Sequence, residues 1–191
     1  TWRDNQYPGA ACDIPSLLYS FSFAQNPGWS RMYSPSEEIC AHIEDLVEQW
    51  ELRPSIRFNT EVTGLVFDED DGVWNVATAD GGSFRSRAVV AAGGPLADAS
   101  FPDVRGIDTY EGHKILSARW DHDYDVTGKD IAVIGTGASA IQIIPEVAKK
   151  AASVKVFQRT PGWVMPQLDL PTPKLAKAIY ATVPGAQQAA R

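Results

Sequence analysis

The segment between residues 131 and 150 constrains the fold of this chain most. A short apolar run, Ile131–Ile134, leads through the turn Gly135-Thr136-Gly137-Ala138-Ser139-Ala140 into a helical pattern that continues to Lys150. A buried strand, a G-x-G-x-x-A turn and a helix in this order are typical of a βαβ unit that binds a dinucleotide. We expect Pro145 to kink or divide the helix, because proline cannot donate a backbone hydrogen bond.

Each small residue of this turn has a separate physical role. Gly135 permits a tight turn, Gly137 lets the backbone approach a pyrophosphate closely, and Ala140 lets the helix pack near the strand. The phosphates are expected at the positive N-terminal end of the helix.

The residues after the second strand of the unit indicate which dinucleotide binds. The strand is predicted over Val154–Phe157, and Gln158, Arg159 and Thr160 follow it. An acidic residue here would accept a hydrogen bond from the ribose 2′-hydroxyl of NAD. A guanidinium beside a hydroxyl instead suits a 2′-phosphate, so the sequence favours NADP(H) over NAD(H). The alternative is a Rossmann-like strand that ends in a solvated arginine.

Residues 34–94 predict a helix and then a small antiparallel sheet. Ser34 as a cap, Pro35 and Glu37 form a helix start, and the helical spacing continues to about Glu51. The apolar period then changes to two, which predicts strands over Ser55–Asn59, Glu61–Phe67, Val73–Ala79 and Ser83–Ala92. Gly93-Gly94 after the last strand suits either a close backbone approach to a ligand or a plain tight turn.

Charge and composition exclude several classes of partner. The 191 residues hold 17 Lys and Arg against 24 Asp and Glu, a net charge of −7, which argues against nucleic acid and anionic membranes. No apolar run approaches the roughly 18 residues of a membrane span, and no leader peptide is visible. Cys12 and Cys40 fit no metal motif and are expected to be buried thiols of a reducing compartment, so we expect a cytoplasmic protein that acts on small molecules.

Four ordered motifs resemble one family, the class B flavoprotein monooxygenases of the Baeyer–Villiger type. The motifs are Trp2-x-x-Asn5-x-Tyr7-Pro8-Gly9-x-x-x-Asp13, Tyr110-x-Gly112 through Trp120-Asp121, the glycine turn through Gln142, and Phe157-Gln158-Arg159-Thr160-Pro161. The second motif departs from the family fingerprint, since Tyr110 replaces a phenylalanine and Leu116 replaces a histidine. His113 is out of register with that histidine.

The resemblance implies an α/β fold with two dinucleotide-binding domains, Rossmann-like parallel sheets and a small antiparallel β insertion. Residues 1–108 would belong to the FAD-binding domain, 109–127 to an interdomain linker, and 128–191 to the start of the NADP-binding domain. The first glycine-rich FAD motif would precede Thr1, and a catalytic arginine would follow Arg191. We therefore expect a fragment that is inactive alone.

The resemblance also implies roles for individual residues. The residues expected to contact FAD are Thr1, Trp2, Arg3, Asp4, Tyr19 and, through its backbone, Val62. Ala11 and Cys12 would border the nicotinamide, and Asp13 would be the catalytic carboxylate that orients the arginine. On its own, Asp13 could equally cap a turn. The residues expected to hold NADP are Gly135, Thr136, Gly137, Ala138, Ser139, Ala140, Ile141, Gln142, Arg159 and Thr160.

The implied activity is an oxygenation that depends on FAD and NADPH. NADPH would reduce FAD, O2 would form a C4a-peroxyflavin, and one oxygen atom would be inserted next to the carbonyl of a ketone. Leu116 keeps open a related flavin monooxygenase that oxidises nitrogen or sulfur centres. A catalytically inactive nucleotide-binding fragment is a third possibility, whereas the lack of a C-x-x-C motif argues against a thiol-disulfide reductase.

Overall fold

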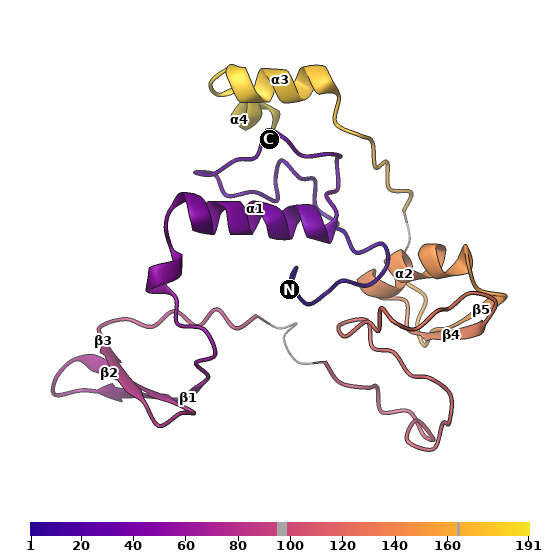
Figure 1. The fold of residues 1–191 in the computed structure, drawn as a ribbon, viewed down its shortest axis with the longest axis horizontal. Helices are drawn as coiled ribbons and strands as arrows, with labels where there is room; N and C mark the ends of the chain where they lie inside the picture. Colours follow the sequence, from indigo (N-terminus) through magenta and orange to yellow (C-terminus); the bar gives the residue numbers. More distant parts are fainter. Residues whose placement is uncertain (95–98, 164) are drawn as a thin grey trace. The chain divides into compact units, whose positions relative to one another are not determined.

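A computed structural model describes residues 1–94, 99–163 and 165–191 (Figure 1). It divides into two compact units, one formed by Thr1–Leu46 with Leu96–Arg191 and the other by Val47–Pro95. One sheet is parallel and the other antiparallel, which confirms the predicted α/β class. The elements in chain order are α1 (Ser36–Gln49), η1 (Arg53–Ser55), β1 (Val62–Asp68), β2 (Val73–Thr78), β3 (Ser83–Ser86), β4 (Asp130–Ile134), α2 (Ala138–Ala148), β5 (Ser153–Phe157), α3 (Lys174–Thr182) and α4 (Ala186–Ala190).

The antiparallel sheet is a meander of β1, β2 and β3 in that order. Leu65 pairs with Val76, which in turn pairs with Phe84, and a register irregularity interrupts the first pairing between Val62 and Gly64. In the first turn Asp68 accepts hydrogen bonds from two following backbone N–H groups, both at 3.1 Å. The alternating pattern therefore predicted these hairpins correctly.

Two of the predicted strands differ in the structure. Ser55–Asn59 is not a strand: Pro54 lies in the 3-10 turn η1, and Asn59 has a φ of 51°, which breaks an extended backbone. The predicted strand from Ser83 ends at Ser86. There the Ser86 hydroxyl donates to the Ala88 carbonyl at 2.6 Å, a local bond that replaces the sheet ladder.

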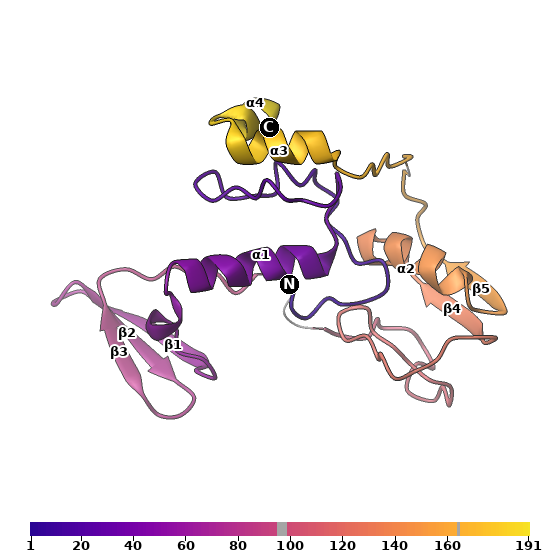
Figure 2. The same ribbon diagram turned by 45° about the horizontal axis from the view of Figure 1, so that its top comes forward.

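The parallel pair β4 and β5 carries helix α2 on one face (Figures 1 and 2). Ile134 pairs with Phe157 at the carboxyl end of the two strands. Ile143 and Val147 are the buried residues of α2, four positions apart and thus on one face of the helix. Pro145 lies within α2, which continues to Ala148, so the proline does not divide the helix.

The N-terminal segment forms loops that pack at the start of α1. The core here consists of Cys12, Trp29 and Ile39, each at most 3% exposed. The helix begins at Ser36, and its first bond joins the Ile39 N–H to the Pro35 carbonyl at 3.2 Å. The predicted cap at Ser34 is wrong, because the Ser34 hydroxyl is buried 2.6 Å from the hydroxyl of Ser16.

Helices α3 and α4 follow a proline-rich stretch and are not predicted by the sequence pattern above. Side-chain bonds join them to the N-terminal loops: Lys177 Nζ donates to the Gly28 carbonyl and Gln187 Nε2 to the Asn26 carbonyl, both at 2.9 Å. Among the helices of the described residues, none has the length and apolar character needed to cross a membrane.

Candidate dinucleotide site

The glycine turn between β4 and α2 is open to a ligand. Gly135 has a φ of +106°, a conformation that side chains rarely adopt, and its N–H donates to the Phe157 carbonyl at 2.8 Å. This bond fixes the turn to the end of β5. A Cβ built on Gly135 or on Gly137 meets no heavy atom of the described residues within 4 Å, so these residues leave the turn open to close approach.

The N-terminal end of α2 is prepared to bind an anion. Its N-cap is Gly137, whose backbone is extended (φ −74°, ψ −179°), and no side chain of the described residues caps the helix there. The first turn carries no acidic residue. The N–H groups of Ala138, Ser139 and Ala140 therefore form a positive helix end that suits a pyrophosphate.

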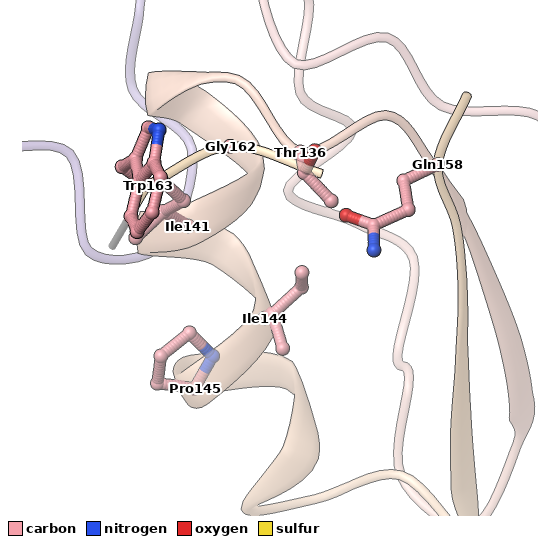
Figure 3. Close-up of a pocket in the computed structure, with 7 residues that line it drawn as sticks. All are labelled: Thr136, Ile141, Ile144, Pro145, Gln158, Gly162 and Trp163. Carbon is pink, nitrogen blue, oxygen red and sulfur yellow. The ribbon is translucent and has the colours of Figure 1, made fainter. Parts of the chain in front are cut away.

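A pocket of about 300 Å³ lies beside this turn (Figure 3). Thr136 and Gln158 supply its polar side chains, and Figure 3 shows them directed toward Ile144. The Trp163 side chain is fully exposed at 103% of its reference area, so an aromatic face lies in solvent at the pocket. The lining residues are Thr136, Ile141, Ile144, Pro145, Gln158, Gly162 and Trp163.

The residues predicted to bind the 2′-phosphate are not among those that line this pocket. Arg159 and Thr160 follow one residue after the end of β5 and are both exposed. Their position at the carboxyl end of a parallel strand is where nucleotide-binding sheets hold their ligands. Gln158, the residue between β5 and Arg159, was not predicted as a site residue, although its place in the same motif could have indicated it.

Gln142 faces the N-terminal segment. Its Oε1 accepts hydrogen bonds from the Tyr7 hydroxyl at 3.0 Å and from the Ala11 N–H at 3.4 Å, and its Nε2 donates to the Ala11 carbonyl at 2.9 Å. The structure thus brings together Ala11 and Gln142, two predicted site residues that are far apart in sequence.

The same segment touches α2 through Gly9. Its φ is +78°, and a Cβ there would lie 2.7 Å from the Gln142 carbonyl oxygen and 3.1 Å from Glu146 Cγ. Only glycine permits both this backbone conformation and this close approach.

The residues predicted to contact FAD lie partly together. Trp2 and Tyr19 are in contact through a hydrogen bond and an edge-to-face ring pair. Thr1–Asp4 forms a turn in which the Thr1 carbonyl accepts from the Asp4 N–H at 3.1 Å. The Arg3 guanidinium hydrogen-bonds the Asp4 carboxylate and lowers the pKa of Asp4. Val62 begins β1 in the other unit.

Cys12 and Asp13 differ sharply in environment. The Cys12 thiol is 3% exposed, and its burial raises its pKa. Asp13 is exposed. Both cysteines are free, Cys12 buried and Cys40 half-buried, so the expectation of two buried thiols holds only for Cys12.

The fingerprint-like segment contains an unpredicted side-chain pair. Leu116 is half-buried, and its carbonyl accepts from the Arg119 N–H at 3.0 Å. His113 Nε2 lies 2.9 Å from Asp121 Oδ2, and its ring stacks on Tyr124 with centroids 4.0 Å apart. The fingerprint comparison leaves His113 out of register, but Asp121, a carboxylate eight positions later, could have indicated this pair. No group of three or more potential metal ligands gathers anywhere in the part of the chain that the structure describes.

Fold and site together define an α/β protein that has a candidate dinucleotide site and a separate antiparallel sheet. The family model described as pyridine nucleotide-disulphide oxidoreductase matches residues 13–177. The chain belongs to this family.

The names of two relatives are more specific than the description of the family model. The chain is 48% identical over 184 residues to a Baeyer–Villiger monooxygenase of Streptomyces coelicolor, covering 96% of this chain and 35% of the relative. It is 44% identical over 169 residues to a Baeyer–Villiger monooxygenase of Pseudomonas aeruginosa, covering 88% and 32%. The resemblance predicted from the four motifs is thus confirmed, and the chain spans about a third of the length of these relatives.

Solved structures agree with this result. Cyclohexanone monooxygenase from Rhodococcus sp. Phi1 bound to NADP+ aligns with a TM-score of 0.83 and 37% identity, covering 96% of this chain and 36% of that one. Oxidized steroid monooxygenase bound to NADP aligns with a TM-score of 0.84 and 41% identity, covering 94% and 36%.

Proposed function

We propose that this chain works within an FAD- and NADPH-dependent monooxygenase of the Baeyer–Villiger type, which inserts one atom of O2 next to the carbonyl of a ketone. The observation that carries the proposal is the uncapped end of α2 beneath an open glycine turn, with Arg159 and Thr160 at the neighbouring strand end. Relatives and solved neighbours named as monooxygenases, two of the neighbours bound to NADP, support it.

The chain's own groups bind and orient NADP(H) in this proposal. The N–H groups of Ala138, Ser139 and Ala140 hold the pyrophosphate, since no protein side chain of the described residues competes for them. The Arg159 guanidinium and the Thr160 hydroxyl bind the 2′-phosphate, which NAD lacks. Thr136, Gly135, Gly137, Ile141 and Gln142 complete the turn and the start of the helix.

On the flavin side, the assignment rests on the family resemblance and on the contacts within the N-terminal loops. Trp2 and Tyr19 supply an aromatic pair, Thr1, Arg3 and Asp4 a polar turn, and Val62 a backbone contact. Ala11 and Cys12 border the nicotinamide, and the exposed Asp13 carboxylate is available to orient a cation. FAD and NADPH, when bound, supply the hydride transfer and the activation of oxygen.

The class of substrate is tested by the product. We expect the protein that carries this chain, supplied with FAD, NADPH and 18O2, to convert cyclohexanone into its ring-expanded lactone with one labelled oxygen atom. A neighbour bound to ε-caprolactone supports this choice of ketone. Because Leu116 occupies the position at which the family fingerprint has a histidine, a sulfide and a tertiary amine are tested in parallel. Labelled sulfoxide or N-oxide without lactone would favour the oxidation of sulfur or nitrogen centres, and NADPH binding without any labelled product would favour an inactive nucleotide-binding module.

The proposal extends to the domain boundaries and to the cellular location of the protein. We propose an FAD-domain portion over 1–108, a linker over 109–127 and an NADP-domain portion over 128–191, in a cytoplasmic protein.

A further inference from the structure

The side chain of Gln142 joins the candidate NADP helix to the candidate nicotinamide segment. Ala11 is bound at both its backbone groups: its N–H donates to Gln142 Oε1 at 3.4 Å, and its carbonyl accepts from Gln142 Nε2 at 2.9 Å. The amide therefore pairs with Ala11 as a neighbouring strand would. A third bond, from the Tyr7 hydroxyl to Gln142 Oε1 at 3.0 Å, fixes the amide orientation.

The segment around Ala11 is held from its other side as well. The Cys12 N–H donates to the Ser34 carbonyl at 3.0 Å, and the Ser36 N–H donates to the Ala10 carbonyl at 2.9 Å. Ala10 and Cys12 are buried, at 7% and 3% exposure. Ala11 therefore lies in a short extended stretch that is bonded to the start of α1 and, through one side chain, to α2.

We propose that Gln142 is a positioning residue: it couples the nucleotide-binding end of α2 to Ala11, Cys12 and Asp13. This inference rests on the proposed function, because it assumes that NADP(H) binds at the turn before Ala138. Gln142 lies five residues after the N-cap Gly137, so a ligand that holds the first turn of α2 also holds the backbone from which the Gln142 side chain extends. Fixing α2 then fixes both backbone groups of Ala11.

The coupling predicts an effect of NADP+ at a segment that lies outside the glycine turn. Amide exchange reports local opening, and a ligand that stabilises one element slows the exchange of any element coupled to it. A net hydrogen bond changes a local equilibrium by about fivefold. In the wild-type chain saturated with NADP+, we therefore expect the backbone amides of Tyr7–Asp13 to exchange at least about threefold more slowly than in the free chain.

Three variants isolate the role of the amide. Gln142→Met keeps the length of the side chain and removes its donor and acceptor, so NADP+ should slow exchange in Tyr7–Asp13 less than in the wild type, and should no longer slow it at Tyr7–Ala10, which do not border the nicotinamide, even at saturation established by calorimetry. Tyr7→Phe removes one bond and keeps the pairing with Ala11, so it should lose only part of the protection. Gln49→Met, the same substitution at an exposed position at the end of α1, should keep the full effect.

The outcomes separate this inference from the function on which it rests. If the wild-type chain binds NADP+ but exchange in Tyr7–Asp13 does not change, or if Gln142→Met retains the protection, Gln142 does not couple the two segments and only this inference is overturned. If the wild-type chain does not bind NADP+, the proposed function fails and the inference fails with it. Should Gln142→Met not fold, wild-type protection in Tyr7→Phe would overturn the inference.

Discussion

Trp2 Nε1 donates a hydrogen bond of 2.9 Å to the hydroxyl of Tyr19, and the two rings meet edge to face with centroids 5.6 Å apart. The sequence separation is 17 residues. This pair joins the N-terminal turn to the loop that follows Leu17 and Leu18, and Trp2 also packs against the core of Cys12, Trp29 and Ile39. It therefore stabilises the part of the chain that is proposed to contact FAD.

Replacing Tyr19 separates the two parts of this contact. We expect Tyr19→Phe to lower the free energy of unfolding by about 1 kcal/mol, because it removes the hydrogen bond and keeps the ring. Tyr19→Ala should cost a further 0.5–1.5 kcal/mol or so, because the aromatic pair is lost as well. Urea unfolding monitored by tryptophan fluorescence measures both values. Equal losses in the two variants would mean that the ring contact contributes nothing.

Gly9 is predicted to be the most sensitive glycine of the N-terminal segment. Gly9→Ala combines a left-handed φ with a Cβ that overlaps the Gln142 carbonyl oxygen, so we expect a loss of about 3 kcal/mol or more in the free energy of unfolding. Gly128→Ala is the matched control: its φ is +69°, but a Cβ there meets nothing within 4 Å. It should lose only about 1 kcal/mol, which is the strain of the backbone alone. The prediction fails if both variants lose the same amount.

The turn between β2 and β3 should become less stable in acid. The Thr78 hydroxyl and the Gly82 N–H both donate to the Asp80 carboxylate, at 2.5 and 3.0 Å, and lower its pKa below the ordinary value of 3.8. A lowered pKa in the folded state means that the stabilisation is present above 3.8 and is lost as the pH falls through the folded-state value. In thermal unfolding, the melting temperature of the wild type should be higher than that of Asp80→Asn at neutral pH, and this difference in melting temperature should shrink in acid. A difference that does not depend on pH would show that the charge of Asp80 is irrelevant.

Asp13 tests whether the N-terminal segment serves the chemistry. Because Asp13 is exposed, we expect Asp13→Ala to change the free energy of unfolding by no more than about 0.5 kcal/mol. In the flavin-loaded monooxygenase the same variant should lose most lactone formation. A variant that unfolds, or that no longer retains flavin, would instead assign Asp13 to the structure of its turn.

The sequence predicted those elements whose signal is local. The turn from Gly135 to Ala140, the strands on either side of it and the hairpins of β1, β2 and β3 all follow from periodicity and glycine placement over a few residues. The strands predicted over Ser55–Asn59 and beyond Ser86 failed for a physical reason. Alternation shows that a segment can form a strand, whereas a strand also needs a partner with which to exchange backbone bonds.

The contacts that organise the candidate site were not predictable in the same way. Gln142 and Ala11 are 131 residues apart, and nothing in either local pattern indicates that one binds the other. The motif predicts Gln142 among the residues that hold NADP, and the structure adds that its side chain bonds a backbone segment. His113 and Asp121 illustrate a related difficulty, since the family fingerprint places its histidine three positions later.

Binding of the two coenzymes to Arg159 variants tests the central claim most directly. Calorimetry with NADP+ and NAD+ is carried out on the wild-type chain, on Arg159→Ala and on Lys155→Ala, a control that removes an exposed positive charge from β5. A charge-assisted hydrogen bond to phosphate contributes about 1.5–3 kcal/mol. Arg159→Ala should therefore weaken the binding of NADP+ by roughly 10- to 100-fold and leave the binding of NAD+ nearly unchanged. Lys155→Ala should change the affinity for either coenzyme by no more than about threefold, because an exposed charge without a direct contact is largely screened. Equal weakening of NADP+ and NAD+ by Arg159→Ala, or a wild-type chain that binds the two equally well, would contradict the assignment of this site to NADP(H).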